Sequence, residues 1–457
     1  MNLYKREKYL KKIRPFYDTE DLIKVITGVR RCGKSSLMKT ICEELESAGI
    51  KDEQIIYIDL DSRKNRNIKT SDELEKVIEE LTITKDKKYL FIDEIQNVNN
   101  FEEIINSYRT DGAYSIFITG SNSYLLSGEL ATKLTGRYVE FELYTLSFDE
   151  YEEMKKFYGK QINPNPLAEL NNYILEGGFP RTIQFDDLSV KRTYTESVVK
   201  EIFEKDIRKR VKIRNKDIFE KVEHFIINNF GSTTSISNLQ KALKQDNIKI
   251  NRSTLANYIQ TLIDAKILYE CQRFDMKSKR SLVGEKKYYV SDLSFYFSLN
   301  TDNQISYGPV LENIIFFYAK SYDYSISVGR IGKLECDFIL RDNDMNYSYL
   351  QIAYTIALNK KTEDREYKPL ESIKDNYPKY IMTTDYLLQK RNGIKHVNLI
   401  EFMASNSKFW LFTNKALNIY INALWLNTCH FKDCFFNLGL KFTWKFSHIN
   451  ALFYLNS

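Results

Sequence analysis

The stretch LIKVITGVRRCGKSSLM at residues 22–38 decides the fold. Its apolar run, residues 22–27, predicts a buried strand, and residues 28–35 fit the pattern G-x-x-x-x-G-K-S/T just before a predicted helix. Glycines let the backbone wrap closely around phosphate oxygens, and the amides at the start of the helix point at the anion. We therefore predict a phosphate-binding loop rather than a glycine turn before an ordinary helix.

Two polar residues of this loop have an expected partner. Lys34 would reach the β and γ phosphates of a nucleotide, and the Ser35 hydroxyl would be a ligand of Mg²⁺. The nucleotide-binding residues that the pattern predicts are Gly28, Arg31, Cys32, Gly33, Lys34, Ser35 and Ser36.

The segment YLFIDEIQ at residues 89–96 supplies the second half of the predicted site. An apolar strand there delivers Asp93 and Glu94 at its carboxyl end, and in a parallel sheet this edge also carries the phosphate loop. Asp93 would hold Mg²⁺, while Glu94 would orient or deprotonate the attacking water. The next strand ends in TGSNS, where Ser121 or Asn122 would contact the γ phosphate or the water.

Around these motifs, short apolar runs alternate with amphipathic stretches, in the order β-α-β-α-β-α-β, which predicts a parallel sheet covered on both faces. The fold class is α/β: a P-loop NTPase sheet over residues 1–148 and a helical lid over residues 149–206, around the turn GGFP. Since the Asn-Lys-x-Asp tetrapeptide of guanine-binding proteins does not occur, adenine is favoured. Arg137 is the predicted catalytic arginine, with Arg181 as the alternative, and either could instead be a surface arginine.

The rest of the chain divides further. Residues 207–292 contain 18 Lys and Arg but 9 Asp and Glu, and three helical stretches followed by two extended runs have the order of a winged helix. A small α/β domain is predicted over residues 293–405. The tail, residues 406–457, holds all three tryptophans and a single acidic residue, and it is either an appended segment or the product of a frameshift or read-through.

These segments together resemble a family of prokaryotic AAA+-like P-loop ATPases that carry a C-terminal domain of unknown function, with a winged-helix part and a degenerate nuclease-like part. The resemblance covers roughly residues 3–403 and runs through ITGVRRCGKSSLM, YLFIDEIQNV, LTGRYVEFELYTLSF, GGFPR and LECDFILR. It implies binding of ATP by residues 28–36, magnesium ligation by Ser35 and Asp93, catalysis by Glu94, and sensing of the γ phosphate by Asn122.

Nucleases of the resembling type need a glutamate on a helix, an aspartate on a strand and a Glu-x-Lys on the next strand, because the carboxylates bind metal. This chain offers Glu312, Glu335 and Asp337, but then Gln351 and Ala353 where the Glu and Lys belong. A neutral amide is a weaker ligand, and alanine removes the ammonium group. We therefore expect the nuclease fold without nuclease activity.

The basic winged-helix segment predicts a partner. Residues 252–287 carry Arg252, Asn257 and Tyr258 on the third helix, and further cations follow in the wing: Arg273, Lys277, Lys279, Arg280, Lys286 and Lys287. Such a surface suits duplex DNA, with affinity that falls steeply with salt. Packing of this module against a neighbouring domain is the alternative, and self-association of the chain also stays open.

The whole chain of 457 residues has a net charge of +6, six cysteines without a Cys-x-x-Cys pair, and no apolar run long enough for a membrane span. Its first residues, MNLYKREKYLKKIRP, are too charged for a signal peptide, so we expect a cytoplasmic protein. The expected function is hydrolysis of Mg-ATP coupled to a conformational change. The alternative is a nucleotide-gated DNA-binding or regulatory module with little turnover.

Overall fold

The computed structural model describes residues 3–120, 134, 136–208, 213, 215–299 and 305–409. The chain divides into two units, Met1–Asn406 and Ser407–Ser457, and the description below concerns the first. Ser121, Asn122 and the tail from residue 410 lie outside the described residues.

A five-stranded, wholly parallel sheet forms the amino-terminal part, in the order β2-β3-β4-β1-β5. Its strands are β1 (Ile23–Thr27), β2 (Ile55–Asp59), β3 (Lys88–Asp93), β4 (Tyr114–Thr119) and β5 (Tyr138–Glu142). The first four were predicted, and all residues of β1, β3 and β4 are buried. Strand β5 is an additional strand at the edge beyond β1, with one buried residue, Phe141.

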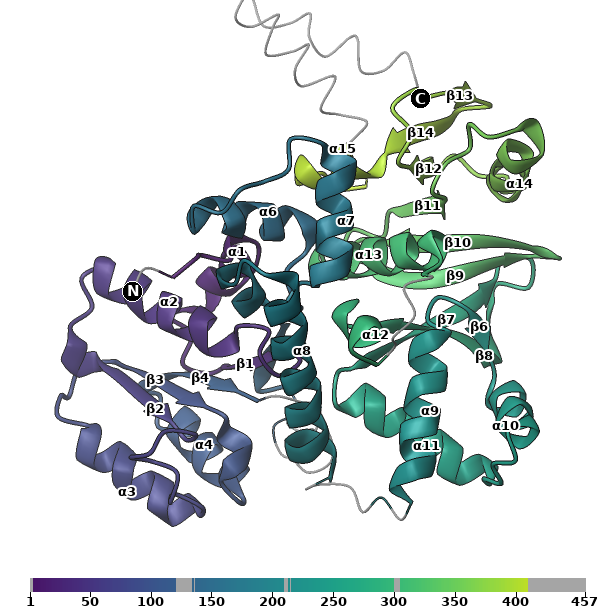
Figure 1. The fold of residues 1–457 in the computed structure, drawn as a ribbon. Coiled ribbons are helices and arrows are strands. Elements are labelled where there is room, and N and C mark those ends of the chain that lie inside the picture. Colours follow the sequence, from purple (N-terminus) through teal and green to yellow (C-terminus); the bar gives the residue numbers. More distant parts are fainter. Residues whose placement is uncertain are drawn as a thin grey trace, which may run out of the picture. The chain divides into compact units, whose positions relative to one another are not determined.

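Helices cover both faces of this sheet, as the apolar strands require. Figure 1 shows α2 on one face and α3 and α4 on the other. Apolar side chains of α3, α4 and the strands form one buried cluster, which includes Leu74, Ile92 and Ile105. The bounds are α1 (Glu7–Ile13), η1 (Arg14–Phe16), α2 (Lys34–Ser47), η2 (Asp52–Gln54), α3 (Ser71–Leu81), η3 (Ile95–Asn97) and α4 (Phe101–Thr110).

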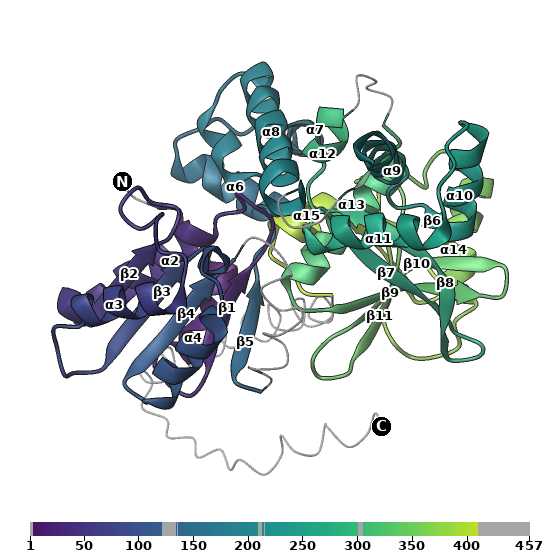
Figure 2. The same cartoon turned by 90° about the horizontal axis from the view of Figure 1, so that it is seen from below.

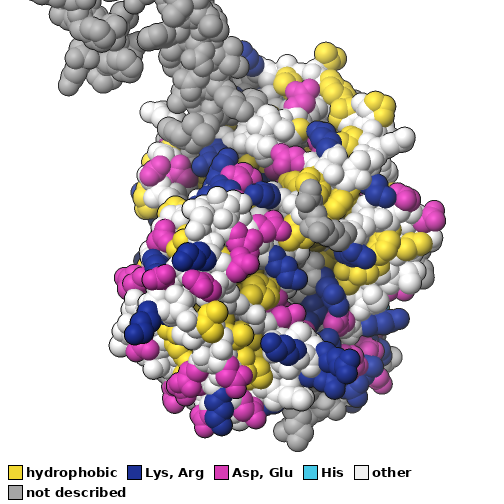
Figure 3. Space-filling model, turned by 90° about the vertical axis from the view of Figure 1, so that its left-hand side faces the viewer, with side chains coloured by type: hydrophobic (Ala, Val, Ile, Leu, Met, Phe, Trp, Pro, Cys, Tyr) yellow, Lys and Arg dark blue, Asp and Glu magenta, His cyan; other side chains and the backbone are white. Residues whose placement is uncertain are grey.

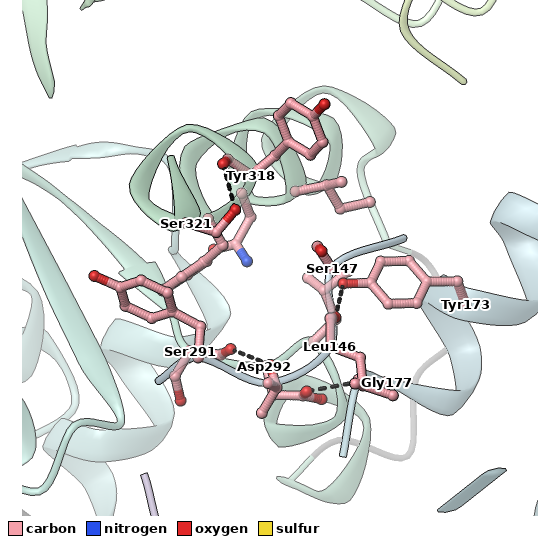
Figure 4. Close-up of a pocket in the computed structure, with 15 residues that line it drawn as sticks. Leu146, Ser147, Tyr173, Gly177, Ser291, Asp292, Tyr318 and Ser321 are labelled. Carbon is pink, nitrogen blue, oxygen red and sulfur yellow. Dashed lines mark hydrogen bonds between the residues drawn. The ribbon is translucent and has the colours of Figure 1, made fainter. Parts of the chain in front are cut away.

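The segment predicted as a lid is helical. It comprises α6 (Phe148–Phe157), α7 (Pro166–Glu176), the 3-10 helix η5 (Pro180–Gln184), α8 (Leu188–Ile202) and the π-helix η6 (Phe203–Arg208). Between α7 and η5, Gly177 has φ 75°, and a Cβ on it would lie 2.3 Å from Oδ1 of Asp292. Figure 4 shows Gly177 beside Asp292, which accepts a hydrogen bond from Gly178 N at 2.8 Å. Glycine at 177 therefore lets the lid pack directly against the C-terminal half.

The remaining strands form one nine-stranded sheet, in the order β13-β14-β12-β11-β10-β9-β7-β8-β6. Residues 215–292 contribute α9 (Lys216–Asn228), β6 (Thr233–Thr234), α10 (Ile236–Gln245), α11 (Arg252–Asp264), β7 (Leu268–Asp275) and β8 (Arg280–Val290). Residues 293–409 contribute α12 (Ser294–Leu299), α13 (Tyr307–Ser321), β9 (Ser325–Ile331), β10 (Leu334–Arg341), β11 (Tyr347–Ile352), α14 (Lys360–Glu371), β12 (Lys379–Thr383), β13 (Lys390–Arg391), β14 (Ile394–Asn398) and α15 (Leu399–Ala404).

The nine-stranded sheet runs across the predicted boundary at residue 292. Strands β7 and β9 pair in parallel, with Arg273 opposite Val328 and Asp275 opposite Arg330, and Figure 2 shows them adjacent. The two C-terminal segments that the sequence separates thus share their backbone hydrogen bonds. Among the residues that the structure describes, no helix has both the length and the apolar character to cross a bilayer.

Candidate functional site

The phosphate loop follows β1 and turns directly into α2. Gly28 has φ 143°, and a Cβ there would lie 2.1 Å from the backbone oxygen of Leu143, so only glycine fits. Gly33, at φ 107°, caps the start of α2, whose first amides have no partner within the helix. Arg31 is also left-handed, at φ 70°. The loop thus turns back on itself between β1 and α2 at positions with positive φ.

Lys34 lies inside the curve of the loop. Its ammonium group donates to the backbone oxygens of Gly28 and Val29, at 3.0 and 3.3 Å, and the residue is only 4 % exposed. The Cys32 side chain is fully buried, while its backbone oxygen accepts a hydrogen bond from Arg6 at 3.2 Å. Cys32 therefore belongs to the scaffold of the loop, and the ammonium group of Lys34 is held by backbone oxygens of the loop.

Asp93 and Glu94 lie at the carboxyl end of β3. The Asp93 carboxylate accepts hydrogen bonds from Thr119 Oγ1 and, at 3.1 Å, from the Tyr57 hydroxyl. Burial and then the charge of Asp93 raise the pKa of Tyr57, so that its proton stays in place. Glu94 has a left-handed backbone, at φ 59°, fixed by its N–H donating to Thr119 Oγ1 at 3.0 Å, and its carboxylate accepts from Gln96. Non-glycine residues in this conformation are frequent at functional sites.

A cavity of about 650 Å³ joins these groups. Lys34, Ser35, Ser36, Asp93 and Glu94 line its polar end, together with Asp59 and Asp61 from the end of β2. The lid contributes further lining residues, among them Arg181, Gln184, Tyr194 and Glu201. A third group is largely apolar: Leu3, Met154, Tyr158 and Pro180. The phosphate loop and the two predicted acids thus line one space, together with residues of the helical segment predicted as a lid.

The structure separates the two predicted arginines. Arg137 precedes β5, whose amino end pairs with that of β1, so it lies at the sheet edge opposite the phosphate loop, where it donates to Asn106 at 3.2 Å. It does not line the cavity of its own chain, because parallel strands put their amino and carboxyl ends at opposite edges. Arg181, on η5, does line it and donates to Gln184. Asn122 lies outside the described residues.

Sequence reasoning gave the Arg30 side chain no role and did not find the acids that hold the loop. Arg30 donates from Nε and Nη2 to the two carboxylate oxygens of Asp206, at 2.8 and 3.0 Å. Burial alone would lower the pKa of Arg30, but Asp206 and then Glu94 raise it. Arg31 donates to Glu201 at 3.0 and 3.1 Å. Both partners lie about 170 residues further along the chain, so only the fold brings them together.

A second set of carboxylates lies in the C-terminal sheet, around Lys287 of β8. Lys287 is 4 % exposed, and its ammonium group lies 2.9 Å from carboxylate oxygens of both Glu312 and Glu335. Against the effect of burial, the charges of Glu312, Asp337 and Glu335 raise the pKa of Lys287. We call Lys287, Glu312, Glu335 and Asp337 the Lys287 cluster.

The neighbours of the Lys287 cluster differ from the expected nuclease set. Gln351 donates to Glu366 at 2.9 Å, and Ala353 is buried. The ammonium group of Lys287 thus neutralises carboxylates that the sequence offers as candidate metal ligands. Over the described ranges of the chain, no group of three or more His, Cys, Asp or Glu side chains is arranged to hold a metal ion.

The predicted DNA-binding cations fall into two groups. Arg273 pairs with Glu285 and Glu335, Lys286 pairs with Glu270, and Lys287 is buried. By contrast, the side chains of Arg252, Asn257, Lys277, Lys279 and Arg280 are exposed. Tyr258 is 7 % exposed and packs edge to face against Phe219, so it belongs to the core.

Two family models match the chain. Residues 20–152 match an AAA domain, and residues 167–305 match a domain of unknown function, DUF8612. The AAA match contains the phosphate loop, Asp93, Glu94 and all five strands of the parallel sheet. It therefore supports the predicted AAA-type P-loop fold of the amino-terminal part.

Similar solved structures include the Walker-type ATPase PABY2304 of Pyrococcus abyssi, at 15 % identity and TM-score 0.45, over 65 % of this chain and 96 % of that one. The AMPPCP-bound DnaA of Aquifex aeolicus has 16 % identity and TM-score 0.30, over 57 % and 88 %. The Aeropyrum pernix Orc1 protein in complex with DNA has 13 % identity and TM-score 0.31, over 66 % and 93 %. At these identities the solved structures do not assign the chain to a family, and the assignment comes from relatives that are similar in sequence.

Two relatives match over most of their length. An uncharacterized protein of Haemophilus influenzae is 33 % identical over 401 residues, which is 87 % of this chain and 98 % of the relative. Protein MJ1544 of Methanocaldococcus jannaschii, also uncharacterized, is 33 % identical over 373 residues, 77 % of this chain and 79 % of the relative. The chain therefore belongs to the family of these two proteins, and its residues 20–152 form the AAA domain.

Proposed function

We propose that this protein binds Mg-ATP between the phosphate loop and the lid and hydrolyses it. The observation that carries the proposal is that four residues from two separate parts of the sheet edge line the same cavity of about 650 Å³: Lys34 and Ser35 at the start of α2, and Asp93 and Glu94 at the end of β3. The AAA domain match over residues 20–152 supports it independently.

The residues fit a magnesium nucleotide. A Ser35 hydroxyl and an Asp93 carboxylate, together with phosphate oxygens, are a usual magnesium set, because this ion keeps few protein ligands. When bound, the ion neutralises charge that develops on the phosphate oxygens. Lys34 would exchange its hydrogen bonds to the Gly28 and Val29 oxygens for phosphate oxygens. Thr119 and Tyr57 position Asp93 by donating hydrogen bonds to its carboxylate.

Glu94 is the general base of this proposal. Its carboxylate faces the cavity and accepts from Gln96, so it can take a proton from water that attacks the γ phosphate. At the apolar part of the cavity, Met154, Tyr158 and Pro180 offer a surface for the adenine ring. Arg181 lines the cavity of its own chain, whereas Arg137 would have to act on a neighbouring subunit.

Measurement of ATP turnover tests the proposal. We expect Glu94→Gln to lower turnover by about 10² to 10⁴-fold while ATP binding is retained, because only the proton acceptor is lost. Lys34→Ala, the control, should lose both binding and turnover. If the parent protein binds ATP but turns over none, the chain is instead a nucleotide-gated module. If it does not bind ATP, the proposal is wrong.

We propose a second role, binding of duplex DNA, for the C-terminal half of the chain. The sequence predicts that this half contains a winged-helix module over residues 207–292 and a nuclease-like domain over residues 293–405. The exposed cations Arg252, Lys277, Lys279 and Arg280 favour docking on duplex DNA. Elsewhere, as on the face in Figure 3, basic and acidic side chains are intermixed.

The exposed wing cations define the test for DNA docking. We expect a triple variant, Lys277→Gln, Lys279→Gln and Arg280→Gln, to bind duplex DNA more weakly and with a salt slope smaller by about 3, one per lost phosphate contact. Lys286→Gln, whose side chain pairs with Glu270, should change little. Binding that does not depend on salt, or that survives the triple change, would leave packing between domains as the role of this module.

A further inference from the structure

The phosphate loop is tied to the lid by two ion pairs. Arg30 binds Asp206 through two parallel hydrogen bonds, at 2.8 and 3.0 Å, and the Asp206 side chain is 1 % exposed. Beside it, Arg31 binds Glu201, which also accepts from Lys205 at 2.7 Å. Two consecutive arginines of the loop thus form ion pairs with acids of α8 and η6.

The acid that holds Arg30 lies on an irregular helix. Asp206 belongs to the π-helix η6, which continues α8, and π-helical turns are rare and frequently occur at functional sites. Downstream of η6 the chain enters α9, the first helix of the C-terminal half. Asp206 therefore lies where the helical segment of residues 149–206 leads into the C-terminal half.

Arg30 also borders the proposed phosphate space. It lines the same cavity as Lys34 and Glu94, and its guanidinium is close enough to Glu94 for that charge to raise the pKa of Arg30. Arg31 and Glu201 line the cavity too. The two ion pairs are therefore part of the wall that a triphosphate would meet.

We propose that Arg30 is a further phosphate-binding residue of this site, and that Asp206 on η6 competes with the nucleotide for it. The inference rests on the proposed function and adds how that site is regulated. Occupation of the phosphate loop would release Asp206, and the state of η6 would thereby report the nucleotide to the C-terminal half.

Elementary electrostatics supports the competition. A guanidinium binds carboxylate and phosphate with the same two-pronged geometry, so one partner can replace the other. A triphosphate in the loop would also repel the carboxylates of Asp206 and Glu201 across a partly buried, weakly screened space. Because coupling of two equilibria is reciprocal, a partner that pulls on η6 would change the affinity for nucleotide by the same factor.

The test compares two acids of the same π-helix. Asp206→Asn removes the carboxylate that binds Arg30 through two hydrogen bonds and leaves Glu201, whose carboxylate lies 4.0 Å from Arg30. Glu204→Gln removes an exposed charge that pairs with Arg208 on the same helix. Calorimetric titration with magnesium and a non-hydrolysable ATP analogue should give a Kd about tenfold lower for Asp206→Asn, within the usual range of such couplings. Glu204→Gln should stay within about twofold of the parent. An unchanged or higher Kd for Asp206→Asn would overturn the inference.

A double variant shows whether the effect passes through Arg30. Arg30→Gln alone should raise the Kd by about tenfold, because a phosphate contact is lost, and in this background Asp206→Asn should change the Kd by less than about twofold. A tenfold gain that persists without Arg30 would mean that Asp206 acts only as a repelling charge.

Hydrogen exchange tests the inference on the unmodified protein, so the result does not depend on whether a variant folds. We expect faster exchange of the amides of residues 203–208 once the ATP analogue is bound, because Asp206 loses its partner in the loop. If the nucleotide binds but exchange of these amides is unchanged or slower, the inference about Asp206 is wrong, while the proposed function still holds. If no nucleotide binds to the unmodified protein, the proposed function itself fails.

Discussion

The two sets of carboxylates in this molecule differ in what balances their charge. Asp93 and Glu94 face a cavity of about 650 Å³ beside Lys34, whereas the acids of the Lys287 cluster surround an ammonium group of their own chain. The first set has an open cavity beside it, whereas the buried ammonium group of Lys287 lies among the acids of the second set. A group of acids therefore indicates a ligand site only where the fold leaves space beside it.

The largest expected difference between the two sets is in turnover. Asp93→Asn should lower magnesium-dependent ATP hydrolysis by about 10³-fold, because the proposed metal ligand loses its charge. Glu335→Gln removes the same charge from the Lys287 cluster and should leave turnover within about twofold. Steady-state assays over a range of magnesium concentrations compare the two. Equal losses in both variants would show that the two sets of acids do not have separate roles.

The next effect is on stability. Lys287→Met should lower the free energy of unfolding by about 3 to 4 kcal/mol, since the buried acids lose their counter-charge. Lys286→Met is the matched control, because the neighbouring side chain is 35 % exposed and pairs with Glu270, and we expect at most about 1 kcal/mol. Urea unfolding measures both. A similar, small loss for the two lysines would mean that the acids of the cluster tolerate solvent or ionise little.

The contrast also shows what sequence can predict. The phosphate loop, Asp93 and Glu94 were predictable because each lies in a short motif next to an apolar strand, and strand ends in a parallel sheet share an edge. The Lys287 cluster was not predictable, because Lys287 and Glu335 form an ion pair although they are 48 positions apart in the chain. In the sequence, Lys287 is one of several lysines and arginines of the predicted wing. Local pattern predicts which residues form a motif, but not which distant charge neutralises it.

Some parts of the fold were missed for a similar reason. Strand β5 alternates charged and apolar residues and lies at an edge, so its run lacks the continuous apolar character of β1 or β3. The parallel pairing of β7 with β9 joins two segments that composition separates. Arg30 looked like an unspecified position of the loop until the fold placed Asp206 against it.

A third environment gives the smallest predicted effect. Glu223 of α9 is 5 % exposed, and burial, followed by the charge of Glu220, raises the pKa of Glu223 from 4.5 to about 7. Neither an open cavity nor an ammonium group balances this carboxyl group among the contacts of the described residues. The folded state therefore holds its proton more tightly than the unfolded state.

The sign of the pH dependence follows from that raised pKa. The contribution of Glu223 to stability is complete below about pH 4.5 and is lost as the pH rises to about 7, where it costs at most about 3 kcal/mol. Glu223→Gln does not titrate, so urea unfolding should find it about 2 to 3 kcal/mol more stable than the parent at pH 8 and nearly equal at pH 4.5. Glu220→Gln, whose side chain is 44 % exposed, should gain much less. A constant difference between Glu223→Gln and the parent across this range would show that the carboxyl group does not change its charge there.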